Sequence, residues 1–468
     1  MRSVLAALIW LAGAGPAAAH AFAERYELPV PVWLFITGGA LTVTITFVMV
    51  GLFARGGAAR YAAARWRLTG AVPGWLRHLA ALLGGAALAL VLAAGFVGNP
   101  SPNRNITPTL VWIIGWVGFS YIAMLIGNPW PAVDPWRTLF DRFGARGGTP
   151  RPWPRRLGAW PQLVLLLLFG WIELVFPFAA KPPVLAGLIA AYSLLAWSVM
   201  TLYGPQAWTS NADPFHRVFD LFGRFAPVSR EGDGLVARLY AARLLGPDTV
   251  VSMPVACFVV AILAIVLFDG LQGSAHWAAL EDAIHDLNPK LGDLGWIIVH
   301  TVGLLLTWLV FLGLFVGTCA LMRRIVGGER STLDYARAFA LTLIPIAVGY
   351  HFAHTFVYLL VQGQNVIAHI SDPFGWGWNL FGTRERPIDI AVINARTAWY
   401  LALTAIVAGH AVSVYLAHAV AERLLGTRDR AFIGLVPMTV LMVIYTIISL
   451  QILAEPLVRY SGPQETII

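Results

Sequence analysis

The chain has 468 residues, of which 58% are hydrophobic and only 12% are charged. Soluble domains carry about 25% charged residues, so the composition excludes a large soluble protein and predicts an all-α integral membrane protein. The formal net charge of +8 comes largely from arginines in short loops between apolar runs. Membrane topology explains such loops, and the charge therefore does not indicate nucleic-acid binding.

The N-terminus has the pattern of a cleavable signal peptide. Residues 1–19, MRSVLAALIWLAGAGPAAA, have a basic start, a short apolar core and a small-residue end. Cleavage after Ala19 would make His20 the mature N-terminus, where its amino group and imidazole are candidate copper ligands. The alternative is that the cleavage site simply falls there.

The mature chain, residues 20–468, is predicted to be one membrane domain, a polytopic helix bundle with short interfacial helices. A helix needs roughly 20 apolar residues to cross the hydrocarbon core. Ten segments meet this requirement: 32–53, 79–97, 108–126, 160–179, 184–204, 250–268, 295–318, 336–361, 396–419 and 431–453.

Charge in the loops predicts the orientation of the bundle. The loops at 54–78, 127–159 and 205–249 are rich in arginine, whereas the loop at 269–294 is acidic and includes Asp269. Because positively charged loops stay in the cytoplasm, we expect a multi-pass protein of a bacterial inner membrane with both termini outside.

One motif occurs three times, and we call it the DP motif. Its copies are DPWRTLFDRFG (134–144), DPFHRVFDLFG (213–223) and DPFGWGWNLFG (372–382). Asp is a favoured N-cap and Pro a favoured first helical residue, so each copy predicts a short helix against the membrane surface. A catalytic role for the three aspartates is the alternative.

Ionisable side chains inside the predicted spans indicate a functional site. His300, His351, His354 and His410 lie in apolar segments, as does Glu173. Such groups are costly at membrane depth unless they are paired, metal-bound or hydrated, and they mark functional sites by default. The helix directions place all five in the outer half of the membrane or, for His410, near its centre, so we expect them to converge.

The sequence around His351 and His354 suits such a site. The two histidines are spaced i, i+3 and so share one helix face, and Pro345 is expected to kink the helix below them. His369 and Asp372 follow as accessory polar residues above the site. The alternative is that each histidine hydrogen-bonds a neighbouring helix and stabilises packing.

Three segments together resemble a known family. HAFAERYELPVPVWLF, GYHFAHTFVYLLVQGQNVIAHISDPFGWGWNLFG and GHAVSVYLAHAVA are similar to bacterial polytopic membrane proteins named fenitrothion hydrolases. The resemblance implies cleavage of an aryl phosphorothioate triester to a nitrophenol and a dialkyl thiophosphate. It carries no catalytic residue over to this chain.

The sequence leaves three functions open. In the first, His351, His354 and His410 hold a divalent metal, zinc, for hydrolysis of a lipophilic small molecule from the bilayer. His300 is then a ligand or proton shuttle, and Glu173 a ligand or general base. In the second, the same histidines bind haem or copper in a redox or metal-handling protein. The third is a small-molecule transporter with an embedded charge.

Overall fold

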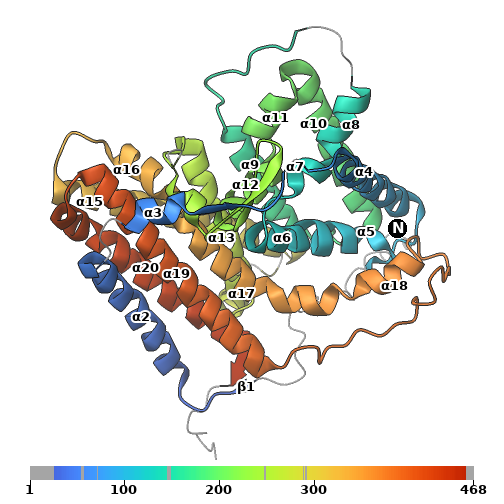
Figure 1. Ribbon diagram of the computed structural model, residues 1–468. Coiled ribbons are helices and arrows are strands. Elements are labelled where there is room, and N and C mark those ends of the chain that lie inside the picture. The colour runs from blue at the N-terminus through green and yellow to red at the C-terminus, as the bar shows by residue number, and fades with distance from the viewer. Residues whose placement is uncertain are drawn as a thin grey trace, which may run out of the picture.

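Figure 1 shows the protein as a computed structural model, which describes residues 26–53, 57–70, 72–144, 149–246, 249–287, 289 and 292–459. The expected signal peptide, 1–19, and His20 lie outside these residues. The described part is a bundle of helices with a few short strands. This confirms the all-α prediction.

Nine helices within the described residues are long and apolar enough to cross a membrane. Each coincides with a predicted span, so this is a multi-pass membrane protein. They are α2 (Val32–Phe53), α4 (Gly74–Val97), α5 to α6 (Ile106–Leu125), α10 (Pro182–Tyr203), α13 (Met253–Gln272), α15 (Gly292–Val326), α16 to α18 (Thr332–Ser371), α19 (Ala395–Leu425) and α20 (Arg428–Leu457).

The tenth predicted span forms a shorter helix. α9 covers Trp160–Leu174 and has 15 residues, or about 22 Å at 1.5 Å per residue. It ends shortly before Pro177, because a proline disfavours helical backbone at the residue that precedes it. α9 packs against α13 and places Glu173 in its last turn.

Two of the membrane segments are interrupted. One contains a π-helix and the other a 3-10 turn that leads into a new α-helix. Pro345 stands in the first turn of that new helix, where the missing N–H costs nothing, so it begins a helix rather than kinking one. The parts are α5 (Ile106–Pro108), the π-helix η3 (Thr109–Gly118), α6 (Phe119–Leu125), α16 (Thr332–Phe339), the 3-10 turn η6 (Ala340–Leu343), α17 (Ile344–Gln362) and α18 (Asn365–Ser371).

α17 and α19 cross with their backbones in close contact. A Cβ atom on Gly409 of α19 would lie 2.5 Å from the carbonyl oxygen of Pro345, and one on Gly349 of α17 would collide with the carbonyl oxygen of Ala405. Glycines let membrane helices approach in this way. α17 also packs against α13 and α12, and it therefore lies at the centre of the bundle (Figure 1).

The first two DP motifs form helices as predicted. α8 (Pro135–Phe143) begins after Asp134, and α12 (Pro214–Phe225) begins after Asp213. Each aspartate accepts hydrogen bonds from two backbone N–H groups of the helix that it caps. Each helix also follows a shorter one, α7 (Trp130–Val133) or α11 (Pro205–Asn211). α12 packs mainly inside the protein, with six buried residues.

The third DP motif does not form a helix, so that prediction is wrong. Gly375 and Gly377 have φ angles of +67° and +92°, a backbone conformation that glycine favours and that ends helices. Asp372 instead closes a turn by accepting hydrogen bonds from the backbone N–H groups of Trp376 and Gly377.

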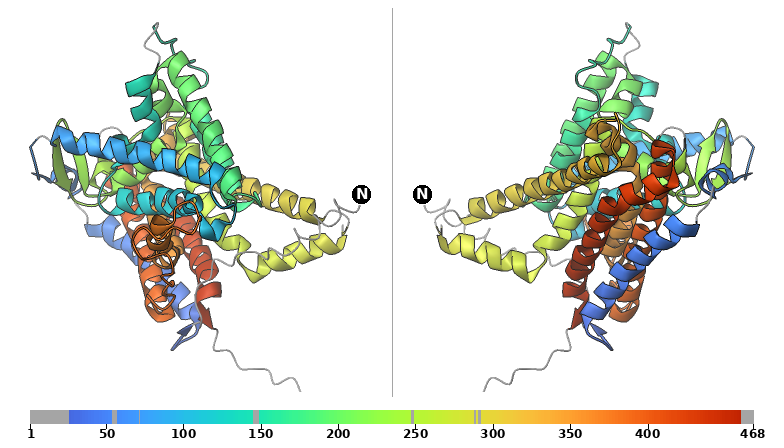
Figure 2. Two further views of the ribbon diagram at one scale, coloured as in Figure 1. Left: turned by 90° about the vertical axis from the view of Figure 1, so that its right-hand side faces the viewer. Right: turned by 90° about the vertical axis from the view of Figure 1, so that its left-hand side faces the viewer.

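A helical hairpin extends to one side of the bundle. α14 (Ala275–Leu287) and the beginning of α15 form it (Figure 2). Two small sheets complete the described fold, with strand orders β2-β4-β3 and β1-β5. The remaining elements are β1 (Tyr26–Glu27), α3 (Gly57–Ala63), β2 (Arg65–Arg67), η2 (Pro102–Arg104), β3 (Val228–Glu231), β4 (Gly234–Arg238), η4 (Ala242–Leu245) and β5 (Val458–Arg459).

Candidate functional site

A histidine and a carboxylate from two membrane-spanning helices form a close pair. His354 Nε2 of α17 lies 2.8 Å from Asp269 Oδ2 of α13. The side chains are 25% and 37% exposed, so the pair is partly covered but not sealed. An imidazole hydrogen-bonded to a carboxylate is a common proton-exchanging arrangement. We call it the His354–Asp269 pair.

The local sequence explains why α13 and α17 meet at this point. α13 continues to Gln272, beyond the predicted end at residue 268, so Asp269 belongs to its last turn rather than to a loop. A Cβ atom on Gly270 would lie 2.9 Å from the Tyr350 hydroxyl oxygen, and its absence lets the helices approach. Tyr350 stacks on His354, with ring centroids 6.3 Å apart and an interplanar angle of 3°.

Glu173 joins the same polar cluster. Its side chain is half-buried and lies within reach of the Trp116 indole of η3. It lies close enough to Asp269 for the two carboxylates to repel each other, and close enough to Tyr358 of α17 to act on that hydroxyl. The pair and Glu173 therefore form one cluster at the end of the bundle where α9 and α13 terminate.

His351 lies near the cluster but in an aromatic cage. Its ring centroid is 6.0 Å from that of Trp116, 6.1 Å from that of Tyr121 and 5.7 Å from that of Phe222. The side chain is 2% exposed, and Nε2 has no hydrogen-bond partner among the described residues. Aromatic packing therefore surrounds this histidine.

The α17–α19 crossing separates His410 from His351. Gly349 faces α19, and His351, two residues later, points about 200° away from that face at 3.6 residues per turn. His410 Nδ1 donates to the Ile406 carbonyl oxygen on its own helix at 2.9 Å. Its Nε2 has no partner within the described part of the chain. The two histidines thus belong to different surroundings.

His300 holds the hairpin of α14 and α15. Its Nε2 lies 2.9 Å from Glu281 Oε1, and its Nδ1 lies 3.0 Å from the Trp296 carbonyl oxygen. The Trp277 indole packs against the ring at 5.5 Å between centroids. His300 is therefore paired with a carboxylate of α14, and it is not part of the His354–Asp269 pair.

His369 and Asp372, the predicted accessory residues, form contacts that fix the path of the chain between α17 and α19. His369 Nδ1 lies 2.8 Å from Thr109 Oγ1, and its Nε2 lies 3.2 Å from the Asn103 carbonyl oxygen. Asp372 closes the turn described above and lies 3.6 Å from Arg384 Nε. Both side chains tie this segment to its surroundings.

The histidines do not gather into a metal-binding group. Within the described ranges, no three or more His, Cys, Asp or Glu side chains lie close enough together to hold a metal ion. His351 and His410 each retain one unpartnered ring nitrogen, but on differently oriented parts of crossing helices. Zinc, copper and haem therefore stay predictions from the sequence.

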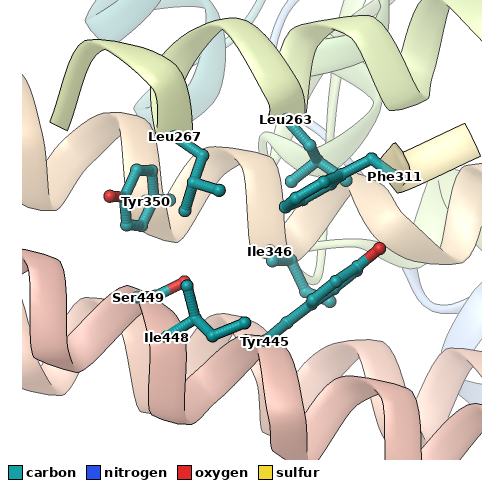
Figure 3. A pocket seen from close by; sticks show the side chains of 8 residues that line it. All are labelled: Leu263, Leu267, Phe311, Ile346, Tyr350, Tyr445, Ile448 and Ser449. Carbon is teal, nitrogen blue, oxygen red and sulfur yellow. The ribbon is translucent and has the colours of Figure 1, made fainter. Parts of the chain in front are cut away.

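A small cavity lies between α13, α15, α17 and α20, and its volume is about 10 Å³ (Figure 3). His354 and Asp269 do not line it, but Tyr350, which stacks on His354, does. Most lining side chains are apolar, and Tyr350 forms one end of it, with its hydroxyl directed away from the other side chains. This volume suits about one water molecule. A larger solute would need the helices to move.

The chain was also compared with known proteins. Comparison with protein-family models, with curated proteins and with solved structures found no match to this chain.

Proposed function

We propose that the protein is a proton-coupled transporter of a small solute, the third of the functions that the sequence leaves open. The observation that carries this proposal is the His354–Asp269 pair between two membrane-spanning helices. Intramembrane His and carboxylate groups are typical of proton relays in pumps and transporters. Glu173 supplies a second carboxylate within electrostatic reach.

Interrupted membrane helices support the same function. Transporters build their sites where discontinuous helices expose backbone groups or leave space, and π-helical turns often mark functional sites. Here the π-helix η3 contributes Trp116, which lies within reach of Glu173. The helix after the 3-10 turn η6 contributes His354. Both interruptions therefore lead into the polar cluster.

The cavity next to Tyr350 holds about one water molecule, so passage of a solute through this part of the bundle would require the helices to move. Alternating access involves such relative motion of helix groups. The tight α17–α19 crossing makes these two helices a unit. α13, which supplies Asp269, meets α17 through the Gly270–Tyr350 contact. Relative motion of α13 and α17 would open the pair.

Hydrolysis is the second candidate, and one observation favours it. A carboxylate that orients an imidazole makes a general base, and the resemblance implies an aryl phosphorothioate triester as substrate. The small cavity next to Tyr350, about 10 Å³, is too small for a triester in this conformation, which weighs against hydrolysis there.

Reconstitution into liposomes that contain a pH-sensitive dye tests the transport proposal. Amino acids, sugars, organic acids and organic phosphates would be added separately at fixed membrane potential. We expect one class to change the internal pH several-fold faster than in empty liposomes. His354→Gln and Asp269→Asn should abolish this change, because each removes one member of the pair.

His276→Gln is the matched control. His276 lies 3.4 Å from Glu455 in another His–carboxylate contact, but its side chain is 83% exposed, so its replacement should leave proton movement unchanged. A His354→Gln protein that moves protons at the wild-type rate would contradict the proposal. In parallel, nitrophenol release from fenitrothion by purified protein, lost in His354→Gln, would favour hydrolysis instead.

A further inference from the structure

The two helical DP motifs bring two buried aspartates close together. Asp134 and Asp213 are 2% and 0% exposed. Trp136 and Phe215, each two residues after its aspartate, stack with ring centroids 6.4 Å apart. The charge of Asp134 acts on Asp213, and both charges act on Tyr192 of α10. Each carboxylate also accepts hydrogen bonds from two backbone N–H groups at the start of a helix. The duplicated motif therefore places two acids in one water-poor location.

The hydrogen bonds of Asp213 are uneven. Its Oδ1 accepts backbone hydrogen bonds from Phe215 and His216 and a third from the Tyr192 hydroxyl at 3.1 Å. Its Oδ2 is buried and has no hydrogen-bond partner among the described residues. An ionised oxygen without a donor is unfavourable away from water. Protonation would remove that charge.

The neighbouring charges are largely engaged with other partners. The groups that face the two aspartates are Arg137 and Asp141 of α8, Tyr192 of α10, and His216, Arg217 and Asp220 of α12. Arg137 bonds Asp141 at 3.2 Å. Arg217 donates to Gln162 and to the Ser210 carbonyl oxygen. These arginines therefore do not neutralise the aspartates at close range.

Burial acts on both acids in the same direction, and at Asp213 the charge of Asp134 adds to it. Burial, followed by the charge of Asp134, raises the pKa of Asp213 well above its ordinary value. Burial also raises the pKa of Asp134, although the backbone N–H groups of Arg137 and Trp136 and the charge of the Arg137 guanidinium oppose the effect. Two carboxylates in such a site do not both ionise readily, and their titrations are coupled.

We propose that Asp134 and Asp213 form a proton-binding site in which two carboxylates hold one proton. The proton resides on Asp213 Oδ2, to which no side chain or backbone group in the described part of the chain donates. Asp134 remains a carboxylate, stabilised by two backbone N–H groups. Proton binding neutralises one carboxylate and breaks no covalent bond in the protein. This site does not depend on the proposed transport function.

The new site lies at the other end of α9 from the His354–Asp269 pair. Gln162 Nε2, in the first turn of α9, donates to the Asp213 carbonyl oxygen at 3.2 Å. Glu173 is eleven residues further along, about 16 Å at 1.5 Å per residue. Aromatic rings lie between: Phe169 contacts Phe215 at 5.0 Å and Trp116 at 4.7 Å between centroids. The protein therefore holds two titratable clusters separated by an aromatic layer.

Infrared spectroscopy of the full-length protein tests this site. A protonated buried carboxyl gives a C=O band distinct from that of carboxylates. We expect wild-type protein at neutral pH to show such a band, and Asp213→Asn to lose one protonated carboxyl per chain. Asparagine is also a good N-cap, so α12 should still form. Absence of any protonated carboxyl in the wild type would overturn the proposal without any variant.

Two further variants assign the band. Asp141→Asn changes an acid that is 54% exposed and paired with Arg137, and it should leave the band unchanged. Glu173→Gln removes any contribution of Glu173 to the C=O band, so the signals of the two sites can be distinguished. In Asp134→Asn, the remaining acid should ionise at lower pH because its charged neighbour is gone. A band that persists unchanged in both Asp213→Asn and Asp134→Asn would overturn the proposal.

Discussion

The crossing of α17 and α19 can be tested with a single methyl group. In Gly409→Ala, the new Cβ would lie 2.5 Å from the Pro345 carbonyl oxygen and 3.2 Å from its carbonyl carbon. An ordinary C···O contact is about 3.3 Å, so the backbones must separate by about 0.8 Å. A gap of 0.5–1 Å forfeits roughly a quarter to a half of the dispersion energy of the atoms that it separates. We expect a loss of about 1–3 kcal/mol, as for other overpacked sites.

Unfolding in a fixed detergent, followed by tryptophan fluorescence, measures this loss. Gly313→Ala on α15 is the matched control, because it makes the same change on a membrane-spanning helix with no atom within 4 Å of the new Cβ. Alanine is a better helix former than glycine by about 1 kcal/mol, so this variant should be as stable as the wild type or more so. Equal effects of Gly409→Ala and Gly313→Ala would refute the close crossing.

Three further predictions concern side chains away from that crossing. Asp213→Asn should flatten the pH dependence of the unfolding free energy. Because the folded pKa of Asp213 is raised, the contribution of this group to stability is greatest below the ordinary carboxyl pKa and is lost, by up to about 1 kcal/mol per pH unit, as the pH rises to the raised value. Asn105→Ala should lower the unfolding free energy by about 1–3 kcal/mol, since buried Asn105 donates to the carbonyls of Ala94 and Asn99; Asn99→Ala keeps that bond and should cost less. Glu281→Gln should speed hydrogen exchange in α14 but not in α13, because Glu281 binds His300 between α14 and α15.

The membrane spans were predictable because hydropathy is a local property. Nine of the ten predicted segments are helices of sufficient length within the described residues. Most of their ends differ from the prediction by six residues or fewer, but the segments predicted to end at 318 and 361 continue to Val326 and Ser371. One such error placed a residue of the candidate site in a loop. The span predicted to end at residue 268 continues to Gln272, so Asp269 lies on a helix and reaches His354. A carboxylate one residue beyond a predicted span, followed by glycine, was the available signal.

Convergence of the histidines was not predictable in the same way. Helix direction and length give the depth of a residue, but not the direction in which its side chain points around the helix axis. That direction depends on which face meets the neighbouring helix. Gly349 and Gly409 select those faces for α17 and α19, and His351 is consequently turned towards Trp116 and Phe222. Residues at one depth can therefore lie in different surroundings.

The DP motif shows how a repeated sequence acquires different roles. All three copies begin with Asp-Pro, and the first two obey the capping preference and form α8 and α12. In the third copy, Gly375 and Gly377 have positive φ angles. Its aspartate therefore accepts a backbone hydrogen bond that closes a turn, and it does not cap a helix. Only the helical copies bring their aspartates together in the interior. There, the protonation of one buried carboxylate depends on the charge of the other. The proposed proton site therefore arises from the pairing of two capped helices, since the aspartate of the third copy is used to hold its own turn.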